Sequence, residues 1–515
     1  RGGARARGGE SVGGRPTPTN RPGRSAVEPF HVMSVLAAAA RRRETHGDVI
    51  SLCAGQPSTP APGPVLAAAH HALDTEILGY TEALGIRPLR EAIAGYHRRR
   101  DGVEVTADDV VVTTGSSGGF TVLFLAAFDP GDTVVMARPG YPAYRNTLQA
   151  LGCRVHEIAC GPESRYQPTV AHLEAVTTRL GHAPAGLIVA SPANPAGTII
   201  GADELAALAR WCAENGTLLV SDEIYHGVTY GRECASAWRT GRESVVMGSV
   251  SKYFSMTGWR IGWMLLPEYL RDPVDRLVGN LTICPPADAQ FAAVAAFTEA
   301  SAAELDGHVE RYARNRDLVL RRLGELGVGE IAPPDGAFYA YFDVSRWTDD
   351  SVGWCAEILE RTGVALTPGV DFDTVDGSHT VRLSFAGVGP LGGAQGLTST
   401  HEFRRDHHRQ RVHHPAVAAA PGAAHGGAGL PQRAGDPRRV HRRLHDLLTG
   451  LRCGGACTPR TGPPSPASPT SWPRATRAPT WPRCGPPNTR SFSSGSCGSR
   501  CSARSATWGS TSPAA

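Results

Sequence analysis

Short apolar runs alternate with amphipathic segments through the middle of the chain. The runs are rich in valine, isoleucine and leucine and have the length of buried strands. Helical periodicity between them predicts helices over residues 120–128 and 203–214. Alternation of strand and helix is typical of an α/β protein with a mostly parallel sheet. The predicted strands are residues 110–114, 133–137, 186–191 and 217–225.

After residue 266 the pattern becomes helical, and a long helix is predicted over about 287–321. The strands that follow, at 337–343, 364–369 and 381–386, predict a second, smaller α+β domain. We therefore expect the following organisation: a disordered segment at 1–25, an N-terminal helix and arm that packs with the small domain at 26–50, a large domain at 51–285, a small domain at 286–386 and a tail at 387–515.

Residues 32–40 are apolar, follow several arginines and end in small residues, which is roughly the plan of a signal peptide. Three arginines follow at once, however, and Phe30, Val32, Met33 and Leu36 lie at helical spacing. An amphipathic N-terminal helix is the preferred interpretation. No apolar run approaches the ~18–20 residues of a membrane span, so no membrane partner is expected.

Both ends of the chain differ from the middle in composition. Residues 1–24 hold six Arg and one Glu, and residues 401–515 hold 17 Arg and four acidic residues. Because the whole chain carries +4, the middle is acidic, which argues against nucleic-acid binding. The tail from Gly387 is either out-of-frame or read-through sequence, or a genuine basic, disordered tail that contacts anions.

The cysteines between residues 25 and 400 are scattered singly, at 53, 153, 160, 212, 234, 284 and 355. No pair has the spacing of metal ligands, and no disulfide framework is indicated. They are interpreted as small buried apolar residues in a reducing compartment. We therefore expect a cytoplasmic protein without a bound metal.

Lys252 is the only lysine among 52 basic residues. Arginine can replace lysine as a positive charge, but it does not supply an unprotonated amine, since its pKa lies above about 12. A single retained lysine therefore indicates a nucleophile or a proton carrier, for which Schiff-base chemistry is the leading example. Chance survival of one lysine is the alternative.

Ser249 and Ser251 form a Ser-x-Ser-Lys pattern with Lys252, and Gly258 and Arg260 follow at six and eight residues. This pattern resembles the cofactor-binding lysine segment of class I/II aminotransferases. The resemblance covers roughly residues 26–386. It implies a fold-type-I transferase that binds pyridoxal 5′-phosphate, with a mostly parallel seven-stranded sheet sandwiched by helices in the large domain.

Two further motifs follow predicted strands. An Asn-Pro-x-Gly motif begins at Asn194, and an Asp-x-x-Tyr motif places Asp222 and Tyr225 at the end of the strand at 217–225. Each has a simpler interpretation, since Asn-Pro forms turns and Asp222 could cap a helix. In the resembling family the asparagine and the tyrosine bind the cofactor's phenolate oxygen, and the aspartate keeps its ring nitrogen protonated.

A glycine-rich turn at 115–119 joins a strand to a helix and is a candidate anion site, because the amides and the positive end of a helix meet there. The resemblance makes this turn the cradle of the cofactor phosphate, with Ser116, Ser117 and Gly118 as its residues. Ser249 and Arg260 complete the phosphate site in the same comparison.

The resemblance also assigns residues that surround the cofactor and substrate. Tyr141 would stack on the pyridine ring, Gly55 would line the substrate pocket, and Arg382 would bind the substrate α-carboxylate in a bidentate manner. Tyr80 would reach the cofactor phosphate of a partner subunit in a homodimer. Local sequence alone is about as consistent with a core role for Tyr141, favours an ordinary turn at Tyr80 and allows an exposed strand position for Arg382.

The resulting expectation is an aminotransferase that moves an amino group from an L-amino acid to a 2-oxo acid through a Lys252 Schiff base, with Lys252, Asp222 and Tyr225 as catalytic residues. A carbon–sulfur β-lyase or a cyclopropane-forming synthase on the same fold is the alternative. A cofactor-binding regulator is a third class, but residues 1–25 are too short and glycine-rich for a DNA-binding domain. A fourth possibility is that the altered C-terminus leaves the protein inactive.

Overall fold

In the computed structural model, residues 23–387 are described, and they belong to one compact unit. A seven-stranded sheet forms its centre, in the order β2-β8-β7-β6-β5-β3-β4. Only β8 runs antiparallel to its neighbours β2 and β7, so the predicted mostly parallel sheet is confirmed. Its strands are β2 (Val110–Thr114), β3 (Thr133–Arg138), β4 (Arg154–Ala159), β5 (Gly186–Ala190), β6 (Leu218–Asp222), β7 (Val245–Ser249) and β8 (Ile261–Leu265).

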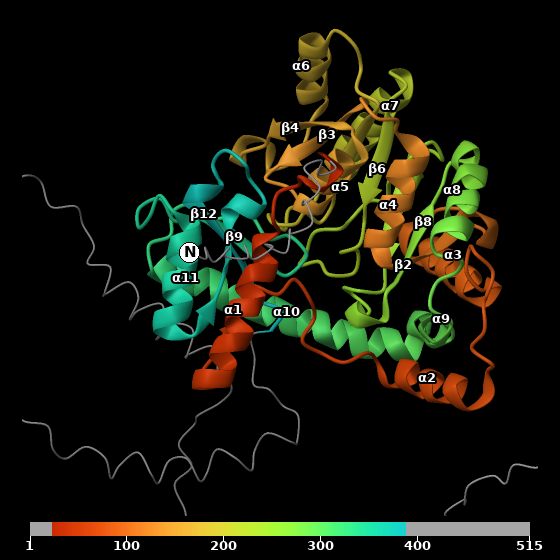
Figure 1. Ribbon diagram of the computed structural model, residues 1–515, viewed down its shortest axis with the longest axis horizontal. Coiled ribbons are helices and arrows are strands. Elements are labelled where there is room, and N and C mark those ends of the chain that lie inside the picture. Colours follow the sequence, from red (N-terminus) through yellow and green to blue (C-terminus); the bar gives the residue numbers. More distant parts are fainter. Residues whose placement is uncertain (1–22, 388–515) are drawn as a thin grey trace, which may run out of the picture. The chain divides into compact units, whose positions relative to one another are not determined.

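Helices cover both faces of this sheet (Figure 1). Alternate strand residues point to opposite faces: Val246 packs in one core, whereas Val245 and Met247 pack in the other. The first core also takes residues of α3 (Arg87–Asp101), α6 (Val170–Leu180), α7 (Ala202–Glu214) and α9 (Ala287–Val294). The second takes residues of α4 (Gly115–Ala127), α5 (Pro142–Leu151) and α8 (Glu268–Leu281).

A three-stranded antiparallel sheet of order β11-β12-β9 lies in the second part of the chain, with α11 (Ser351–Thr362) against it. Its strands are β9 (Tyr339–Asp343), β11 (Thr367–Pro368) and β12 (Thr380–Ser384). A short strand, β1 (Ile50–Ser51), pairs in parallel with β10 (Val364–Ala365). The two strands form a separate small sheet, which joins the segment before the large sheet to the chain between α11 and β11.

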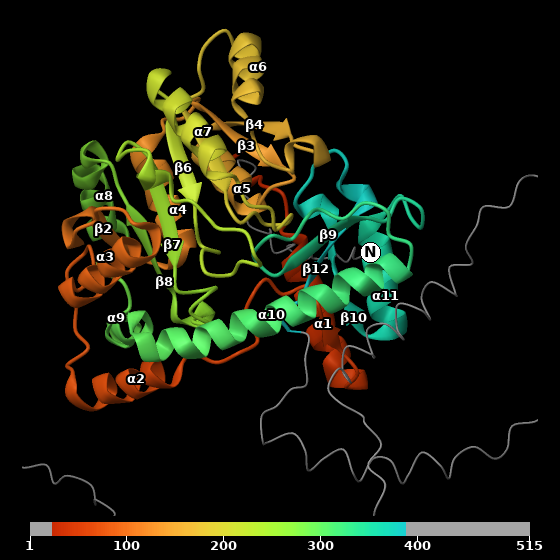
Figure 2. The ribbon, with the colours of Figure 1, turned by 180° about the vertical axis from the view of Figure 1, so that it is seen from behind.

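Two predicted helices have different bounds in the structure. The helix predicted over 287–321 is wrong as a single element, because a 3-10 turn at Ala295–Phe297 separates α9 from α10 (Glu299–Glu325), and Thr298 caps the second helix. Figure 2 shows α10 extending from α2 (Gly63–Thr75) and α9 towards β9. The helix predicted from residue 120 begins at Gly115, so the glycine-rich turn is the first turn of α4 itself.

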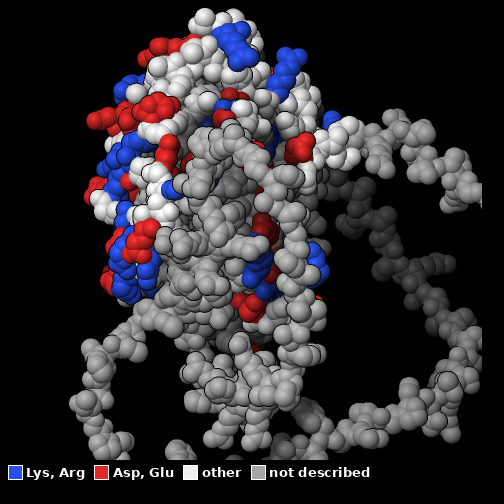
Figure 3. Space-filling model, turned by 90° about the vertical axis from the view of Figure 1, so that its left-hand side faces the viewer, with Lys and Arg blue, Asp and Glu red and all other residues white. Residues whose placement is uncertain are grey.

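The predicted N-terminal helix is confirmed as α1 (His31–His46), which packs beside β10, β11 and α11. Within residues 23–387, no helix combines the length and apolar character that crossing a membrane requires. Acidic and basic side chains are interspersed on the described part of the face in Figure 3. Residues 388–515 of the predicted tail and residues 1–22 of the predicted disordered segment lie outside the described residues, whereas Gly23–Ser25, predicted to be disordered, form a 3-10 turn.

Candidate active site

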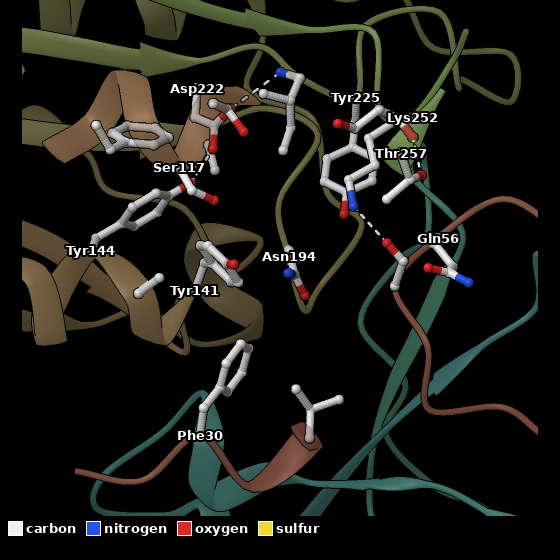
Figure 4. Close-up of a pocket in the computed structure, with 18 of the residues that line it drawn as sticks. Phe30, Gln56, Ser117, Tyr141, Tyr144, Asn194, Asp222, Tyr225, Lys252 and Thr257 are labelled. Carbon is white, nitrogen blue, oxygen red and sulfur yellow. Dashed lines mark hydrogen bonds between the residues drawn. The ribbon is translucent and has the colours of Figure 1, made fainter. Parts of the chain in front are cut away.

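A cavity of about 330 Å³ opens where the carboxyl ends of the parallel strands meet the small sheet. This edge is where α/β proteins bind ligands, because strand ends and helix starts converge there. The loop after β5, the last residue of β6 and the segment after β7 bring Asn194, Asp222 and Lys252 to the cavity, although these residues are far apart in sequence (Figure 4). Its wall also includes Gly55, Ser116, Ser117, Tyr141, Tyr225, Arg260 and Arg382, as the sequence predicts.

Lys252 lies partly buried at one side of the cavity. Its Nζ donates to the backbone oxygen of Gly55 at 2.5 Å and lies 5.4 Å from the ring centre of Tyr225. Burial, together with the positive charges of Arg382 and Arg260, lowers the pKa of Lys252 to about 8. An appreciable fraction of this amine is therefore unprotonated near neutral pH, as a nucleophile or base requires.

Asp222 ends β6 and is buried. Its Oδ2 accepts a hydrogen bond from the Tyr144 hydroxyl, and its Oδ1 accepts the Ile224 N–H at 3.2 Å. Burial raises the pKa of Asp222 to about 6, although these bonds and Lys252 act in the opposite direction. The carboxylate thus connects the end of β6 to helix α5 and is not merely a local cap.

Tyr225 and Tyr339 form a buried pair whose hydroxyl oxygens lie 2.5 Å apart. Tyr339 comes from β9, so the pair joins the loop after β6 to the small sheet. Gly55 passes close to this pair, and a Cβ there would lie 2.5 Å from the Tyr339 hydroxyl. The substrate-pocket prediction for Gly55 therefore has a steric basis: a side chain would collide with the wall.

Arg382 is buried in β12, which rules out an exposed strand arginine. Its Nη1 donates to Asn194 Oδ1 at 2.8 Å, and its Nη2 donates to the backbone oxygen of Cys53 at 2.7 Å. Its guanidinium carbon lies 4.5 Å from the ring centre of Tyr339, and its Nε has no hydrogen-bond partner. The bonds hold the guanidinium in place and leave N–H groups to spare for an anion.

An anion-binding set lies at the other end of the cavity. Ser116 and Ser117 belong to the first turn of α4, and Ser251, Thr257 and Arg260 follow β7. Arg260 Nη1 donates to the Thr257 backbone oxygen at 2.9 Å. Gly115, at φ +68°, admits the guanidinium, since a Cβ there would collide with it. Hydroxyls, helix-end amides and a guanidinium together are a donor set suited to phosphate.

Three predicted site residues do not line the cavity. Ser249 lies behind Ser251 and donates to its hydroxyl at 2.8 Å, Gly118 lies within α4, and Tyr80 is 85% exposed. The sequence-based prediction did not include Ser251 and Thr257, which also line the cavity. Their place in the same segment as Lys252 could have indicated them. The prediction also missed Tyr144 and Tyr339, for which one weak signal existed: Tyr144 follows Tyr141 by one helical turn.

These features together fit pyridoxal 5′-phosphate. The serines and Arg260 can hold a phosphate, and the amine of Lys252 can meet an aldehyde. Asp222, with its raised pKa, is a matching partner for a protonated ring nitrogen. A mostly parallel sheet with an aspartate after one central strand and a lysine after the next defines a pyridoxal-phosphate enzyme of fold type I.

Comparison with known proteins narrows this class. Residues 47–390 match the family described as aminotransferase class I and II. The chain is 55% identical to the valine–pyruvate aminotransferase of Mycobacterium tuberculosis, over 71% of this chain and 93% of that one. It is 36% identical to the aspartate/prephenate aminotransferase of Thermus thermophilus, over 70% and 92%. The crystal structure of an aminotransferase from Mycobacterium tuberculosis superimposes with a TM-score of 0.69 and 54% identity, over 72% and 95%.

The chain therefore belongs to the class I and II aminotransferases, which depend on pyridoxal phosphate and transfer amino groups between amino acids and 2-oxo acids. The relatives named above are aminotransferases, which favours amino transfer over the lyase alternative.

Proposed function

We propose that this aminotransferase takes its amino group from valine or another amino acid with an aliphatic side chain, and passes it to pyruvate or another 2-oxo acid with one carboxylate. The observation that carries this proposal is the distribution of charge in the cavity. Its lining contains three cations, Lys252, Arg260 and Arg382. The predicted roles occupy all three, and among the described residues that line the cavity no further cation is left for a second carboxylate of the substrate.

The remaining lining supports an aliphatic substrate. The first turns of α1 contribute Phe30, Val32, Met33 and Leu36, and Ile224 adds a further apolar side chain. An apolar wall of this kind favours a branched hydrocarbon over a carboxylate, because burying an unpaired charge is costly. The 55% identity to a valine–pyruvate aminotransferase points in the same direction.

Each polar residue then has a definite role. When bound, pyridoxal phosphate supplies an aldehyde that captures amines and a ring that accepts electron density from the substrate Cα. Lys252 takes the proton from Cα and returns it during the transfer, for which its pKa of about 8 is suited. Asp222 holds a proton on the ring nitrogen. Arg382 binds the α-carboxylate through its spare N–H groups.

The other residues position these groups. The Oδ1 of Asn194 accepts a hydrogen bond from Arg382, so its Nδ2 group remains available to donate to the phenolate oxygen of the cofactor. Tyr225 donates to the same oxygen, while Tyr339 holds the Tyr225 hydroxyl. Tyr141 covers the ring. Ser116, Ser117 and Arg260, with Gly118 and Ser249 behind them, hold the phosphate.

We further propose a homodimer in the cytoplasm. Tyr80 projects into solvent from the loop before α3 and does not reach the cavity of its own chain. An exposed tyrosine at this position is suited to the phosphate of a partner subunit. The described cysteines are free, as expected in a reducing compartment.

The half-reaction with single amino acids tests the proposed substrate. The purified holoenzyme is mixed with valine, isoleucine, leucine, alanine, aspartate or glutamate, and the absorbance of the bound cofactor is followed. The kcat/KM of the half-reaction should be at least ten times higher for valine than for aspartate or glutamate. An aspartate rate equal to the valine rate would refute the proposal.

A further inference from the structure

Helix α1 has no capping side chain of its own at its first turn. Its N-cap residue is Phe30, whose side chain cannot accept a hydrogen bond. The first N–H groups of a helix have no acceptor within the helix, so they need one from elsewhere. Asp371 supplies it: the His31 N–H donates to its Oδ1 and the Val32 N–H to its Oδ2, both at 2.7 Å.

Asp371 is itself held firmly. It ends a 3-10 turn at Gly369–Asp371, between β11 and β12, and is 2% exposed. The next residue, Phe372, accepts the Gly140 N–H at 2.8 Å on its backbone oxygen, and its ring centre lies 4.7 Å from the guanidinium carbon of Arg382. The carboxylate that caps α1 is therefore adjacent to the residue that packs on the predicted carboxylate-binding arginine.

The capped turn is also a wall of the cavity. Phe30 and Val32 flank the cap, and Met33 and Leu36 follow on the same side of α1. Figure 4 shows the Phe30 ring pointing towards Tyr141, with the ring centres 6.0 Å apart and the planes nearly perpendicular. The position of the wall thus depends on how the first turn of α1 is fixed.

We infer that Asp371 is a positioning residue for side-chain selection: by capping α1 from the small sheet, it sets the distance between the apolar wall and Arg382. The inference rests on the proposed aliphatic substrate. Asp371 does not line the cavity, and its side-chain hydrogen bonds to the apolar wall go to the first turn of α1. A negative charge at a helix N-terminus also stabilises that end of the helix. Loss of the carboxylate should loosen the wall and leave the proton-transfer groups in place.

The expected effect is a loss of discrimination between substrates of different size. One methylene in an apolar pocket is worth about 10- to 200-fold in kcat/KM. The valine-to-alanine ratio of kcat/KM should therefore fall about tenfold in Asp371→Ala, mainly because the KM for valine rises. The alanine value should change less than threefold, because its methyl group does not reach far along the wall.

The experiment uses the full-length holoenzyme and two readouts. The first is kcat/KM in the half-reaction with alanine, 2-aminobutyrate, valine and leucine. The second is hydrogen exchange of the peptide that contains the His31 and Val32 amides, which should exchange at least ten times faster in Asp371→Ala. Asp371→Asn keeps one acceptor oxygen and should be intermediate in both. Leu36→Ala should lower the valine-to-alanine ratio with the cap intact.

Asp373→Asn is the matched control. Asp373 is also buried, lies two residues away and accepts the N–H groups of Val375 and Asp376 at 2.9 Å, and its ion pair is with Arg138 and not with a residue of α1. This variant should leave the exchange of His31 and Val32 and the substrate ratio unchanged. Should Asp371→Ala fail to fold, Asp371→Asn and Leu36→Ala carry the test.

Three results would overturn the inference. The first is unchanged hydrogen exchange at the start of α1 in Asp371→Ala, and the second is faster exchange with an unchanged valine-to-alanine ratio. The third is an equal loss of kcat/KM with every amino acid, if Asp373→Asn shows the same loss. Failure of the proposed function is separate, since it shows as a wild-type preference for another class of amino acid. In that case the kcat/KM ratio of the preferred amino acid to alanine replaces the valine-to-alanine ratio. The hydrogen-exchange test of the His31 and Val32 amides does not depend on the substrate and stays the same.

Discussion

Replacing Tyr144 by phenylalanine removes one hydroxyl and tests how the buried aspartate is controlled. The Tyr144 hydroxyl donates to Asp222 Oδ2. Among the residues that the structure describes, the only other hydrogen bond to this carboxylate comes from the Ile224 N–H, at 3.2 Å. The substitution keeps the ring, which packs against Phe120 and Tyr141, so its effect should be electrostatic.

The size of the effect follows from the free energy of that hydrogen bond. A hydrogen bond to a charged group contributes about 1.5–3 kcal/mol, and a change of one in pKa corresponds to about 1.4 kcal/mol. The bond favours the ionised carboxylate, so its loss should raise the pKa of Asp222 from about 6 by roughly one to two. The ionised form, which pairs with a protonated ring nitrogen, then appears only at higher pH.

The measurement is kcat/KM for valine and pyruvate between pH 5.5 and 9.5. In Tyr144→Phe the acid limb of the profile should move upwards by about one to two pH units, with a loss of about 5- to 50-fold at pH 6, where the wild-type carboxylate is already half protonated, and near-normal activity at pH 9. Tyr341→Phe is the control, because its buried hydroxyl contacts Thr380 at 2.7 Å outside the cavity. An unchanged profile, or a loss equal at every pH, would refute the reasoning.

Four further results are expected. Lys252→Arg keeps the charge but should abolish turnover, and hydride trapping of the cofactor on another residue of the wild type would contradict its role. Asp222→Ala should keep the cofactor, by absorbance, and lose several orders of magnitude in kcat, whereas a near-normal rate would make it a structural aspartate. Burial, with Asp101 adding to it, raises the pKa of Glu223 to about 8 from 4.5. The folded state therefore holds a proton that the unfolded chain releases, and stability should fall as pH rises from about 4.5 to about 8. Glu223→Gln should flatten this dependence by up to a few kcal/mol in urea unfolding, and parallel curves would exclude the assignment. Deleting residues 401–515 should leave cofactor absorbance intact, since the family match ends at residue 390, and loss of cofactor would show that the tail belongs to the active structure.

The sequence determined those features whose cause is local. Runs of valine, isoleucine and leucine predict strands because they suit a buried pleated surface, and β2 was predicted to the residue. The single lysine and the short motifs around Asn194 and Asp222 predicted the chemistry, because they combine residue types with limited roles. The break between α9 and α10 was not predictable from periodicity, since both helices continue one apolar pattern.

Only the tertiary structure decided which groups support these residues. Tyr144 meets Asp222 across 78 positions, Tyr339 meets Tyr225 across 114, and Asp371 caps a helix 340 positions earlier. None of these supporting residues lies in a motif. Their pairing depends on which strands and helices become neighbours, and that is set by packing of the whole core, whereas the chemistry of a lysine or an aspartate is a property of the residue itself.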